Sequence, residues 1–210
     1  MTLGVNLDLR SQILLERKSL SAADVSLRSL QLCKKFVRLL THEDVNCLAV
    51  YRRMGLYRAL KGEVELDSLE RVLSDIHISL FYPQVSDRDL NTLLMVSADP
   101  FCPDHWVKGP YGVMEPSSLV LPDLLPELIL VPGVAFGEQG ERIGMGAGYY
   151  DRYLATHPQI LRVALCFDFQ IRQKVEQKPW DQAVDWVIGE SRDYKGPHFA
   201  DRFAKCVKKA

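Results

Sequence analysis

The sequence lacks the patterns that mark several large protein classes. Its five cysteines include no C-x-x-C pair and are odd in number, so they favour neither a disulfide framework nor a zinc site. Its five histidines form no H-x-x-x-H pair. With a net charge of −1, the chain has no basic field that would hold nucleic acid or an anionic membrane. Reduced thiols in a cytoplasmic protein are the simplest account of the cysteines.

Long hydrophobic runs are also missing. The stretch from Met1 to Arg10 contains no apolar segment of signal-peptide length. The longest apolar run, Leu128 to Phe136, is interrupted by Pro132 and Gly133 and is too short to span a bilayer. The 210 residues are 47% apolar and 25% charged, which is typical of a globular protein with a sizeable core. We therefore expect one soluble domain over residues 1–210.

Hydrophobic spacing predicts an alternation of helices and strands. Helices are expected over residues 8–18, from Ser21 (a potential N-cap) to about Leu40, and over 65–73, 148–155 and 170–176. Strands are expected over residues 47–51, 77–82, 92–97, 128–131, 160–167 and 184–188. Six prolines punctuate residues 99–126, which we predict to form a long functional loop. The alternation predicts a single three-layer α/β domain with a central, mostly parallel sheet and helices on both faces.

Residues 130–152 carry the strongest functional pattern. A buried strand ends at Pro132-Gly133, glycines follow at positions 140, 144, 146 and 148, and a helix then begins. Glycine lets the backbone approach a ligand, and successive N–H groups at a helix N-terminus can cradle an anion. Arg142 adds a fork of donors that suits phosphate oxygens, and Asp151 offers a hard oxygen to Mg²⁺. Together these features predict a polyphosphate site.

The glycines alone have other interpretations. They also suit a tight turn, or close packing of a helix on a strand. No Gly-Lys-Ser/Thr follows them, so the segment is not a Walker loop, and their alternation differs from the dinucleotide-binding fingerprint. The arginine, the run Tyr149-Tyr150-Asp151 and the preceding Pro132-Gly133 shift the interpretation towards a functional site.

The same segment resembles the hallmark of a known family, the 5-formyltetrahydrofolate cyclo-ligases, also called methenyltetrahydrofolate synthetases. The matching residues are Pro132-Gly133, Phe136, Gly140, Arg142-Ile143-Gly144, Gly146, Gly148-Tyr149-Tyr150-Asp151-Arg152 and Leu154. Further likeness lies in Tyr111-Gly112-Val113 with Glu115-Pro116, and in Asp181, Val184-Asp185 and Glu190. Leu9-Arg10 and Glu63 extend it towards the N-terminus. The resemblance therefore covers nearly the whole chain.

This resemblance implies an ATP- and Mg²⁺-dependent ligase that converts 5-formyltetrahydrofolate to 5,10-methenyltetrahydrofolate, with ADP and phosphate released. It implies catalytic roles for Arg142, Tyr150 and Asp151, and a metal site at Asp151 and Asp185. The implied ATP-binding residues are Arg10, Arg142, Ile143, Gly144, Met145, Gly146, Ala147, Gly148, Tyr149 and Tyr150. The implied substrate-binding residues are Glu63, Met145, Gly146, Ala147, Gly148 and Tyr149. We expect a cytoplasmic monomer whose partners are the folate and MgATP, with neither nucleic acid nor membrane.

Three positions depart from the family pattern. Asn6 stands where a lysine usually precedes the N-terminal arginine by four residues, Gly137 replaces an aspartate, and Gly189 replaces a threonine. Loss of the lysine removes a phosphate contact, so weaker ATP binding is expected with no change of fold. The departures at Asn6 and Gly137 keep a second hypothesis open, a non-catalytic folate- or nucleotide-binding protein on the same scaffold.

Individual residues also have structural interpretations. Asp151 could pair with the neighbouring Arg152, and Asp185 could be a polar residue at the start of a strand. Trp106 and Tyr111 lie in the proline-rich region and could cover an aromatic ligand, although packing is the more common fate of such residues. Against a pure binding protein stand Arg142 and the two aspartates, because a binder has little need for a pair of metal-binding carboxylates.

Overall fold

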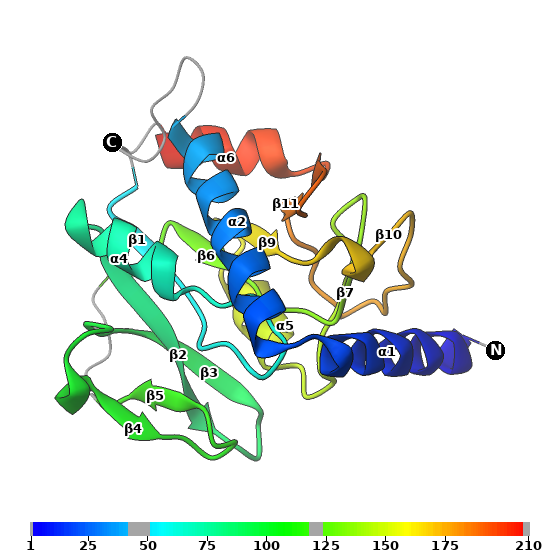
Figure 1. The fold of residues 1–210 in the computed structure, drawn as a ribbon, viewed down its shortest axis with the longest axis horizontal. Coiled ribbons are helices and arrows are strands. Elements are labelled where there is room, and N and C mark those ends of the chain that lie inside the picture. Colours follow the sequence, from blue (N-terminus) through cyan, green and yellow to red (C-terminus); the bar gives the residue numbers. More distant parts are fainter. Residues whose placement is uncertain (1, 42–50, 118–123, 208–210) are drawn as a thin grey trace.

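The computed structural model describes residues 2–41, 51–117 and 124–207, with side chains described over 9–41, 51–117 and 124–205 (Figure 1). Its helices are α1 (Thr2–Ser19), α2 (Ala22–Thr41), α4 (Asp67–Asp75), α5 (Tyr149–Thr156) and α6 (Phe199–Val207). Its strands are β1 (Arg53–Gly55), β2 (Ser79–Asp87), β3 (Thr92–Ser97), β4 (Trp106–Lys108), β5 (Met114–Pro116), β6 (Leu128–Leu130), β7 (Ala135–Gly137), β8 (Arg142–Ile143), β9 (Leu161–Leu165), β10 (Ile171–Arg172), β11 (Trp186–Ile188) and β12 (Asp193–Lys195).

The centre of the molecule is a seven-stranded sheet in the order β12-β11-β9-β6-β1-β2-β3. The five inner strands β11, β9, β6, β1 and β2 are parallel to one another, and the edge strands β12 and β3 pair antiparallel with β11 and β2. Because parallel strands are buried on both faces, they consist of nearly continuous apolar residues, as in the fully buried β6 and β9. The predicted mostly parallel sheet is confirmed.

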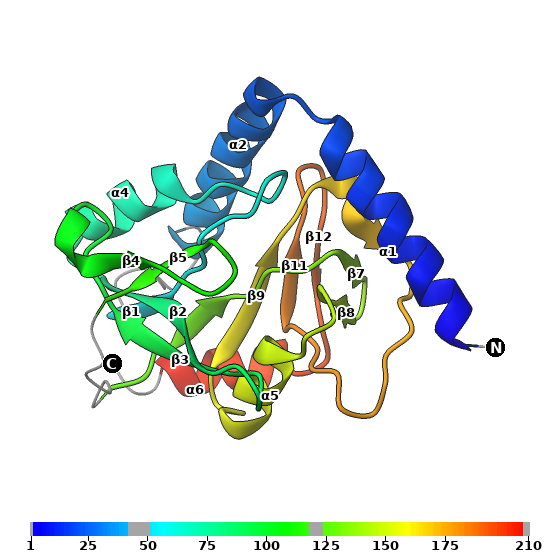
Figure 2. The ribbon, with the colours of Figure 1, turned by 90° about the horizontal axis from the view of Figure 1, so that it is seen from below.

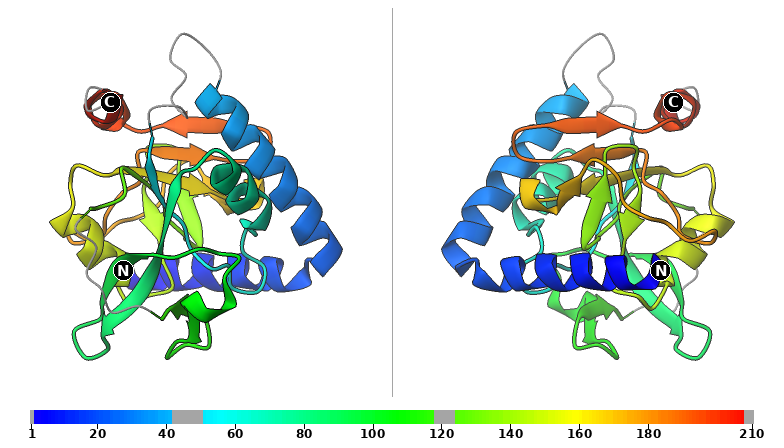
Figure 3. Two further views of the ribbon diagram at one scale, coloured as in Figure 1. Left: turned by 90° about the vertical axis from the view of Figure 1, so that its left-hand side faces the viewer. Right: turned by 90° about the vertical axis from the view of Figure 1, so that its right-hand side faces the viewer.

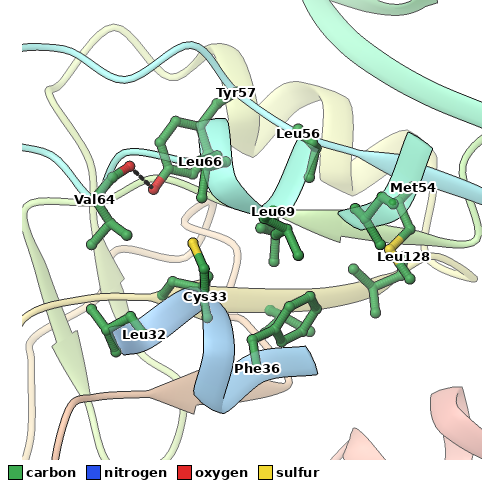
Figure 4. Packing of buried hydrophobic residues seen from close by; sticks show 14 of the residues in the cluster. Leu32, Cys33, Phe36, Met54, Leu56, Tyr57, Val64, Leu66, Leu69 and Leu128 are labelled. Carbon is green, nitrogen blue, oxygen red and sulfur yellow. Dashed lines mark hydrogen bonds between the residues drawn. The ribbon is translucent and has the colours of Figure 1, made fainter. Parts of the chain in front are cut away.

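Helices α2 and α4 cover one face of this sheet. Ser21 caps α2 by accepting a 3.1 Å hydrogen bond from the backbone N–H of Asp24, which confirms the predicted start of the helix. The apolar stripe of α2 packs Leu32, Cys33 and Phe36 against residues of α4 and of the sheet (Figure 4). Burial raises the pKa of the Cys33 thiol to about 11, so Cys33 stays protonated and acts as a small apolar side chain.

Helix α5 covers the opposite face, together with a small second sheet. Tyr153 and Leu154 of α5 pack with Ile129 of β6 and Ala164 of β9, and Figure 3 shows α2 and α5 on opposite sides of the central sheet. The second sheet has the order β10-β7-β8. Helices therefore cover both faces, which confirms the predicted three-layer arrangement.

Helix α1 lies along the second sheet and reaches the region where the glycine-rich segment folds (Figure 2). Its fully buried Ile13 belongs to a small apolar cluster with Ala135 of β7, Ile143 of β8 and Val175. This packing fixes the helix beside β7 and β8. No helix among the described residues is long and apolar enough to cross a membrane.

Two predicted elements differ from the structure. The helix expected over 170–176 is wrong: a 3-10 turn (Asp168–Gln170) leads directly into β10. The buried side chain of Gln170 causes this, because it bonds to the backbone of Phe167, Gly133 and Val134 and holds the turn against β7. The region expected to be one long loop contains the antiparallel hairpin β4–β5. The strand expected over 47–51 lies almost entirely outside the described residues, and β1 begins at Arg53.

Candidate functional site

A cavity of about 1020 Å³ lies where the glycine-rich segment, helix α1 and three loops meet. Its lining includes Arg10 of α1, Glu63, all of residues 142–152 and residues 176–178. Apolar side chains of β2 and β3 form another part of the wall. Every residue to which the sequence assigned a catalytic, binding or metal role lines this cavity, with the exception of Asp185.

The glycine loop at 144–148 ends at α5 and has a backbone that favours glycine. Gly146 has φ 112° and Gly148 has φ 77°, both in the left-handed region that other residues rarely adopt. At Gly146 the nearest atom to an added Cβ would be Arg10 Nη1 at 3.9 Å, so backbone conformation and not crowding excludes a side chain there. Gly148 is the N-cap of α5, whose N-terminus thus opens on the cavity.

Two arginines hold the carbonyl groups of this loop. Arg10 donates from Nε to the oxygen of Gly144 at 3.2 Å, and Arg152 donates from Nη1 to the oxygen of Ala147 at 3.0 Å. Both arginines also line the cavity. The loop is therefore fixed from α1 on one side and from α5 on the other, with positive charge at both contacts.

Arg142 and Asp151 form an ion pair in the wall of the cavity. Arg142 Nη2 donates to Asp151 Oδ1 at 2.6 Å, and the arginine side chain is only 3% exposed. Nη1 donates to the oxygen of Pro132 at 3.2 Å, so the guanidinium also ties the loop to the end of β6. The alternative pairing of Asp151 with Arg152 is not formed. Much of the donor capacity of Arg142 is therefore used inside the protein, and one of its bonds fixes the Asp151 carboxylate.

Asp151 keeps one oxygen for a ligand. Its Oδ1 accepts hydrogen bonds from Arg142 and from the backbone N–H of Gln182, the latter at 3.0 Å. These bonds leave Oδ2 on a side chain that is 17% exposed and lines the cavity. The described residues contain no group of three His, Cys, Asp or Glu side chains that could hold a metal ion by themselves. A single carboxylate suits Mg²⁺, which is commonly held by one or two carboxylates plus water and phosphate oxygens.

Asp185 is the predicted metal ligand that the structure places elsewhere. It is 1% exposed, and its Oδ1 accepts a hydrogen bond from Arg202 of α6. Its Oδ2 accepts the backbone N–H of Arg162 at 2.9 Å. Burial raises the pKa of Asp185, and the N–H of Arg162 and the charge of Arg202 partly offset that effect. Since the side chain is almost fully buried and does not line the cavity, we leave Asp185 out of the candidate metal site.

The two tyrosines at the start of α5 differ in their surroundings. Tyr150 is partly buried in the cavity wall, and burial raises the pKa of its phenol above the usual range, so it carries a neutral hydroxyl at physiological pH. Tyr149 shares a 2.7 Å hydrogen bond with Tyr111, which raises the pKa of Tyr149 to about 12. Tyr111 lies between β4 and β5, so this bond joins the hairpin to α5 beside the cavity.

Glu63 lies in the cavity wall and is held by helix α1. Its Oε1 pairs with Arg17 Nη2 at 2.9 Å, and its Oε2 accepts the backbone N–H of Leu60 at 3.0 Å. Arg17 also donates from Nε to the oxygen of Gly62 at 2.9 Å. A carboxylate oxygen can accept more than one hydrogen bond, so Glu63 can still accept from a ligand.

The sequence did not single out several residues that line the cavity. They are Arg58, Lys178 and Trp180 in loops, and Pro83, Val85 and Leu93 on β2 and β3. The loop residues follow no periodic pattern that would indicate a site. The strand residues belong to apolar runs that predict core packing. Trp106 lines a smaller neighbouring cavity of about 440 Å³, where its ring packs 3.9 Å from the Arg58 guanidinium and edge-on to Tyr82.

Two of the three departures from the family pattern lie away from the cavity. Gly137 ends β7 and Gly189 follows β11, and neither lines the cavity. A Cβ at Gly137 would lie 2.0 Å from a carboxylate oxygen of Glu141, and one at Gly189 would lie 2.4 Å from Asp168 Oδ1. A side chain at Gly137 would require the flexible Glu141 side chain to move, whereas one at Gly189 would also meet Ile171 and the backbone oxygen of Arg192. Local packing therefore favours glycine more strongly at Gly189. The side chain of Asn6, the third departure, lies outside the described side chains.

Comparison with known proteins identifies the family. The sequence model of the 5-formyltetrahydrofolate cyclo-ligase family matches residues 4–190. A 5-formyltetrahydrofolate cyclo-ligase of Mycoplasma pneumoniae is 28% identical over 185 residues, which cover 87% of this chain and 96% of that protein. One from Escherichia coli is 26% identical over 161 residues, covering 74% and 85%.

The fold has the same relatives. The structure of the 5,10-methenyltetrahydrofolate synthetase of Aquifex aeolicus superposes with a TM-score of 0.75 at 27% identity, over 91% of this chain and 92% of that one. The family match covers most of the chain and includes the whole glycine-rich segment. This protein therefore belongs to the 5-formyltetrahydrofolate cyclo-ligase family.

Proposed function

We propose that this protein uses ATP and Mg²⁺ in its main cavity to cyclise 5-formyltetrahydrofolate to 5,10-methenyltetrahydrofolate, with release of ADP and phosphate. The observation that carries the proposal is the convergence of the predicted residues on one cavity of about 1020 Å³. This volume is at the upper end of the usual range for a ligand pocket, roughly 300–1000 Å³, and suits two ligands that react with each other.

The reaction requires activation of a poor electrophile. In the proposed sequence the γ-phosphoryl group moves from ATP to the formyl oxygen, so the bond to ADP breaks as a new P–O bond forms. The neighbouring folate nitrogen then attacks the formyl carbon and loses its proton, and phosphate leaves with the former formyl oxygen. Phosphoryl transfer depends mainly on alignment and charge stabilisation, which a rigid loop and fixed charges can supply.

The phosphate end of the cavity is assigned to the glycine loop. Backbone N–H groups of residues 144–148 and the N-terminus of α5 would bind the phosphates, with Arg10 and Arg152 beside them. Asp151 would hold Mg²⁺ through Oδ2 while Arg142 fixes the carboxylate. Bound there, Mg²⁺ would neutralise charge on the phosphoryl group in transfer. Tyr150 would donate a hydrogen bond near the reacting atoms from its neutral hydroxyl.

The folate end is assigned to the wall formed by Glu63 and the apolar residues of β2 and β3. Pro83, Val85 and Leu93 offer an apolar surface to an aromatic ring. Glu63 offers a carboxylate to ring N–H groups, and Arg17 fixes its position. We further propose that the protein acts as a monomer in the cytoplasm.

The test is direct formation of product. Purified protein with 5-formyltetrahydrofolate and MgATP should develop the near-ultraviolet absorbance of the methenyl product. The Asp151→Asn variant should lose this activity, whereas Asp201→Asn, a matched change on the exposed surface of α6, should keep it. Binding of both ligands by the wild-type protein without product would instead favour the non-catalytic hypothesis.

A further inference from the structure

Trp180 is unusually exposed for a tryptophan. The side chain is 65% exposed although it belongs to the lining of the main cavity. Tryptophan has a large apolar surface and is highly buried on average, and its exposed instances are enriched where a partner binds. A solvent-exposed indole inside a binding cavity therefore calls for an explanation by a ligand.

The indole is presented by a fixed turn. Residues 173–185 contain no helix or strand, so side-chain bonds set their course. The N–H of Lys178 donates to Asp181 Oδ2 at 2.7 Å, and the N–H of Asp181 donates to the oxygen of Lys178 at 3.0 Å. Trp180 lies between these two residues. One step further along, the N–H of Gln182 bonds to Asp151, which ties the turn to the candidate metal ligand.

The ring of Trp180 has area left for a ligand. Its described ring contact is the Lys178 ammonium, 5.5 Å from the ring centre. The other exposed aromatic residue in the cavity lining, Tyr111, is already hydrogen-bonded to Tyr149 and packed edge-on against it with ring centres 5.8 Å apart. Of the two exposed aromatic residues in the described cavity lining, Trp180 is thus the one with room for a further ring.

We infer that Trp180 stacks on the nucleobase of ATP, an inference that rests on the proposed function. Two ligands with aromatic rings would share the cavity, and the turn at 178–181 joins the end where Asp151 and the glycine loop lie. Lys178 supports this assignment, because a cation beside the ring suits a triphosphate. Glu63 and the apolar strand residues, assigned to the folate, belong to other segments.

Calorimetry on the whole 210-residue chain separates base binding from phosphate binding. The probes are MgATP, magnesium tripolyphosphate and 5-formyltetrahydrofolate, measured with the wild type, Trp180→Ala and Trp180→Phe. Stacking on an aromatic side chain predicts that Trp180→Ala raises the Kd for ATP about tenfold. The Kd values for tripolyphosphate and folate should stay unchanged, and Trp180→Phe should recover most of the ATP affinity.

Phe101→Ala is the matched control, because Phe101 is 52% exposed and does not line the cavity. It should leave all three Kd values unchanged. An equal loss of ATP and tripolyphosphate affinity in Trp180→Ala would overturn the inference, as would a loss of folate affinity alone or unchanged ATP affinity. If the wild type itself binds no ATP, the proposed function fails and the inference fails with it.

Discussion

The protein contains two largely buried arginine–aspartate pairs whose carboxylates differ in their access to ligands. The pair Arg142–Asp151 lies in the cavity wall, and its carboxylate is 17% exposed. The pair Arg202–Asp185 lies between α6 and the start of β11, and its carboxylate is 1% exposed. The same two residue types therefore form a site in one region and a structural link in the other.

The difference comes from what fills the coordination positions of each aspartate. Asp151 concentrates its internal bonds on one oxygen, whereas Asp185 uses both of its oxygens. A metal ion can reach Asp151 from the cavity, but it would have to displace Arg202 to reach Asp185. Access and free lone pairs, more than residue type, decide which carboxylate can serve as a ligand.

The largest effect is expected from Asp151→Asn. The amide keeps the size of the side chain but removes the charge that Mg²⁺ prefers, so the turnover rate should fall by about a hundredfold to a thousandfold. The Kd for folate should change little. Product absorbance and folate calorimetry measure the two effects, and an unchanged rate at limiting Mg²⁺ would remove Asp151 from the site.

Gly146→Val should come next, with ATP affinity reduced by about a hundredfold in a protein that remains folded. A β-branched side chain resists the φ of 112° at this position and fills space needed by phosphates. Gly112→Val is the matched control, because Gly112 has φ 76° but lies in the hairpin and not in the cavity lining. If Gly146→Val binds ATP normally by calorimetry, the loop is only structural.

Asp185→Asn tests the other side of the comparison. Loss of this buried charge leaves Arg202 without its partner, so we expect the free energy of unfolding to fall by about 3–5 kcal/mol. The rate should fall less than about tenfold, since a positioning effect is smaller than loss of a metal ligand. Denaturant unfolding and the product assay give the two numbers.

The double variant Asp151→Asn with Asp185→Asn decides whether the aspartates act separately. If the roles are independent, the two increases in activation free energy should add, so the two fold-losses in rate should multiply. If both aspartates hold one metal ion, the combined increase in activation free energy should be smaller than the sum. A clearly sub-additive result would return Asp185 to the metal site and would require Arg202 to move when the ion binds.

The smallest effect is expected at Asn6. Asn6→Lys would add a cation one helical turn before Arg10 and should tighten ATP binding several-fold, or by about 1 kcal/mol. The gain should shrink as salt is raised. Lys18 and Lys61 do not line the cavity. Arg152 and Lys178 are among the basic residues that do line it, and either could already supply the missing charge. An unchanged Kd in Asn6→Lys, with a loss in Lys178→Met, would assign the role to Lys178.

Much of the lining of the candidate site could be predicted from the sequence because its residues are neighbours in the chain. The glycine loop, Arg142 and Asp151 lie within ten positions, so local conformation is enough to bring them together. Asp185 could not be judged in this way, because its partner Arg202 comes from a helix that the periodicity did not reveal. Trp180 was missed for a related reason, since its position depends on a side-chain turn and not on a helix or strand.

The fold shows the same division. The parallel strands were predictable from continuous apolar runs, because burial on both faces leaves a clear signal. The turn at Gln170 was not, because its buried amide side chain bonds to one nearby backbone group, at Phe167, and to two distant ones, at Gly133 and Val134, and these bonds override local preference. The hairpin β4–β5 was not predicted, because the prolines around its short strands favoured a loop.

Helix α1 has a mechanical consequence for the cavity as a whole. Arg10 contacts the glycine loop and Arg17 contacts Glu63 and Gly62, so one rigid rod touches both ends of the cavity. Seven residues of α-helix span about 10 Å and nearly two turns, which keeps both arginines on one side of the rod. One residue inserted between them would rotate one arginine by about 100° relative to the other. Helix α1 thus sets the distance between the glycine loop and Glu63, even if α1 itself touches neither of the atoms that react.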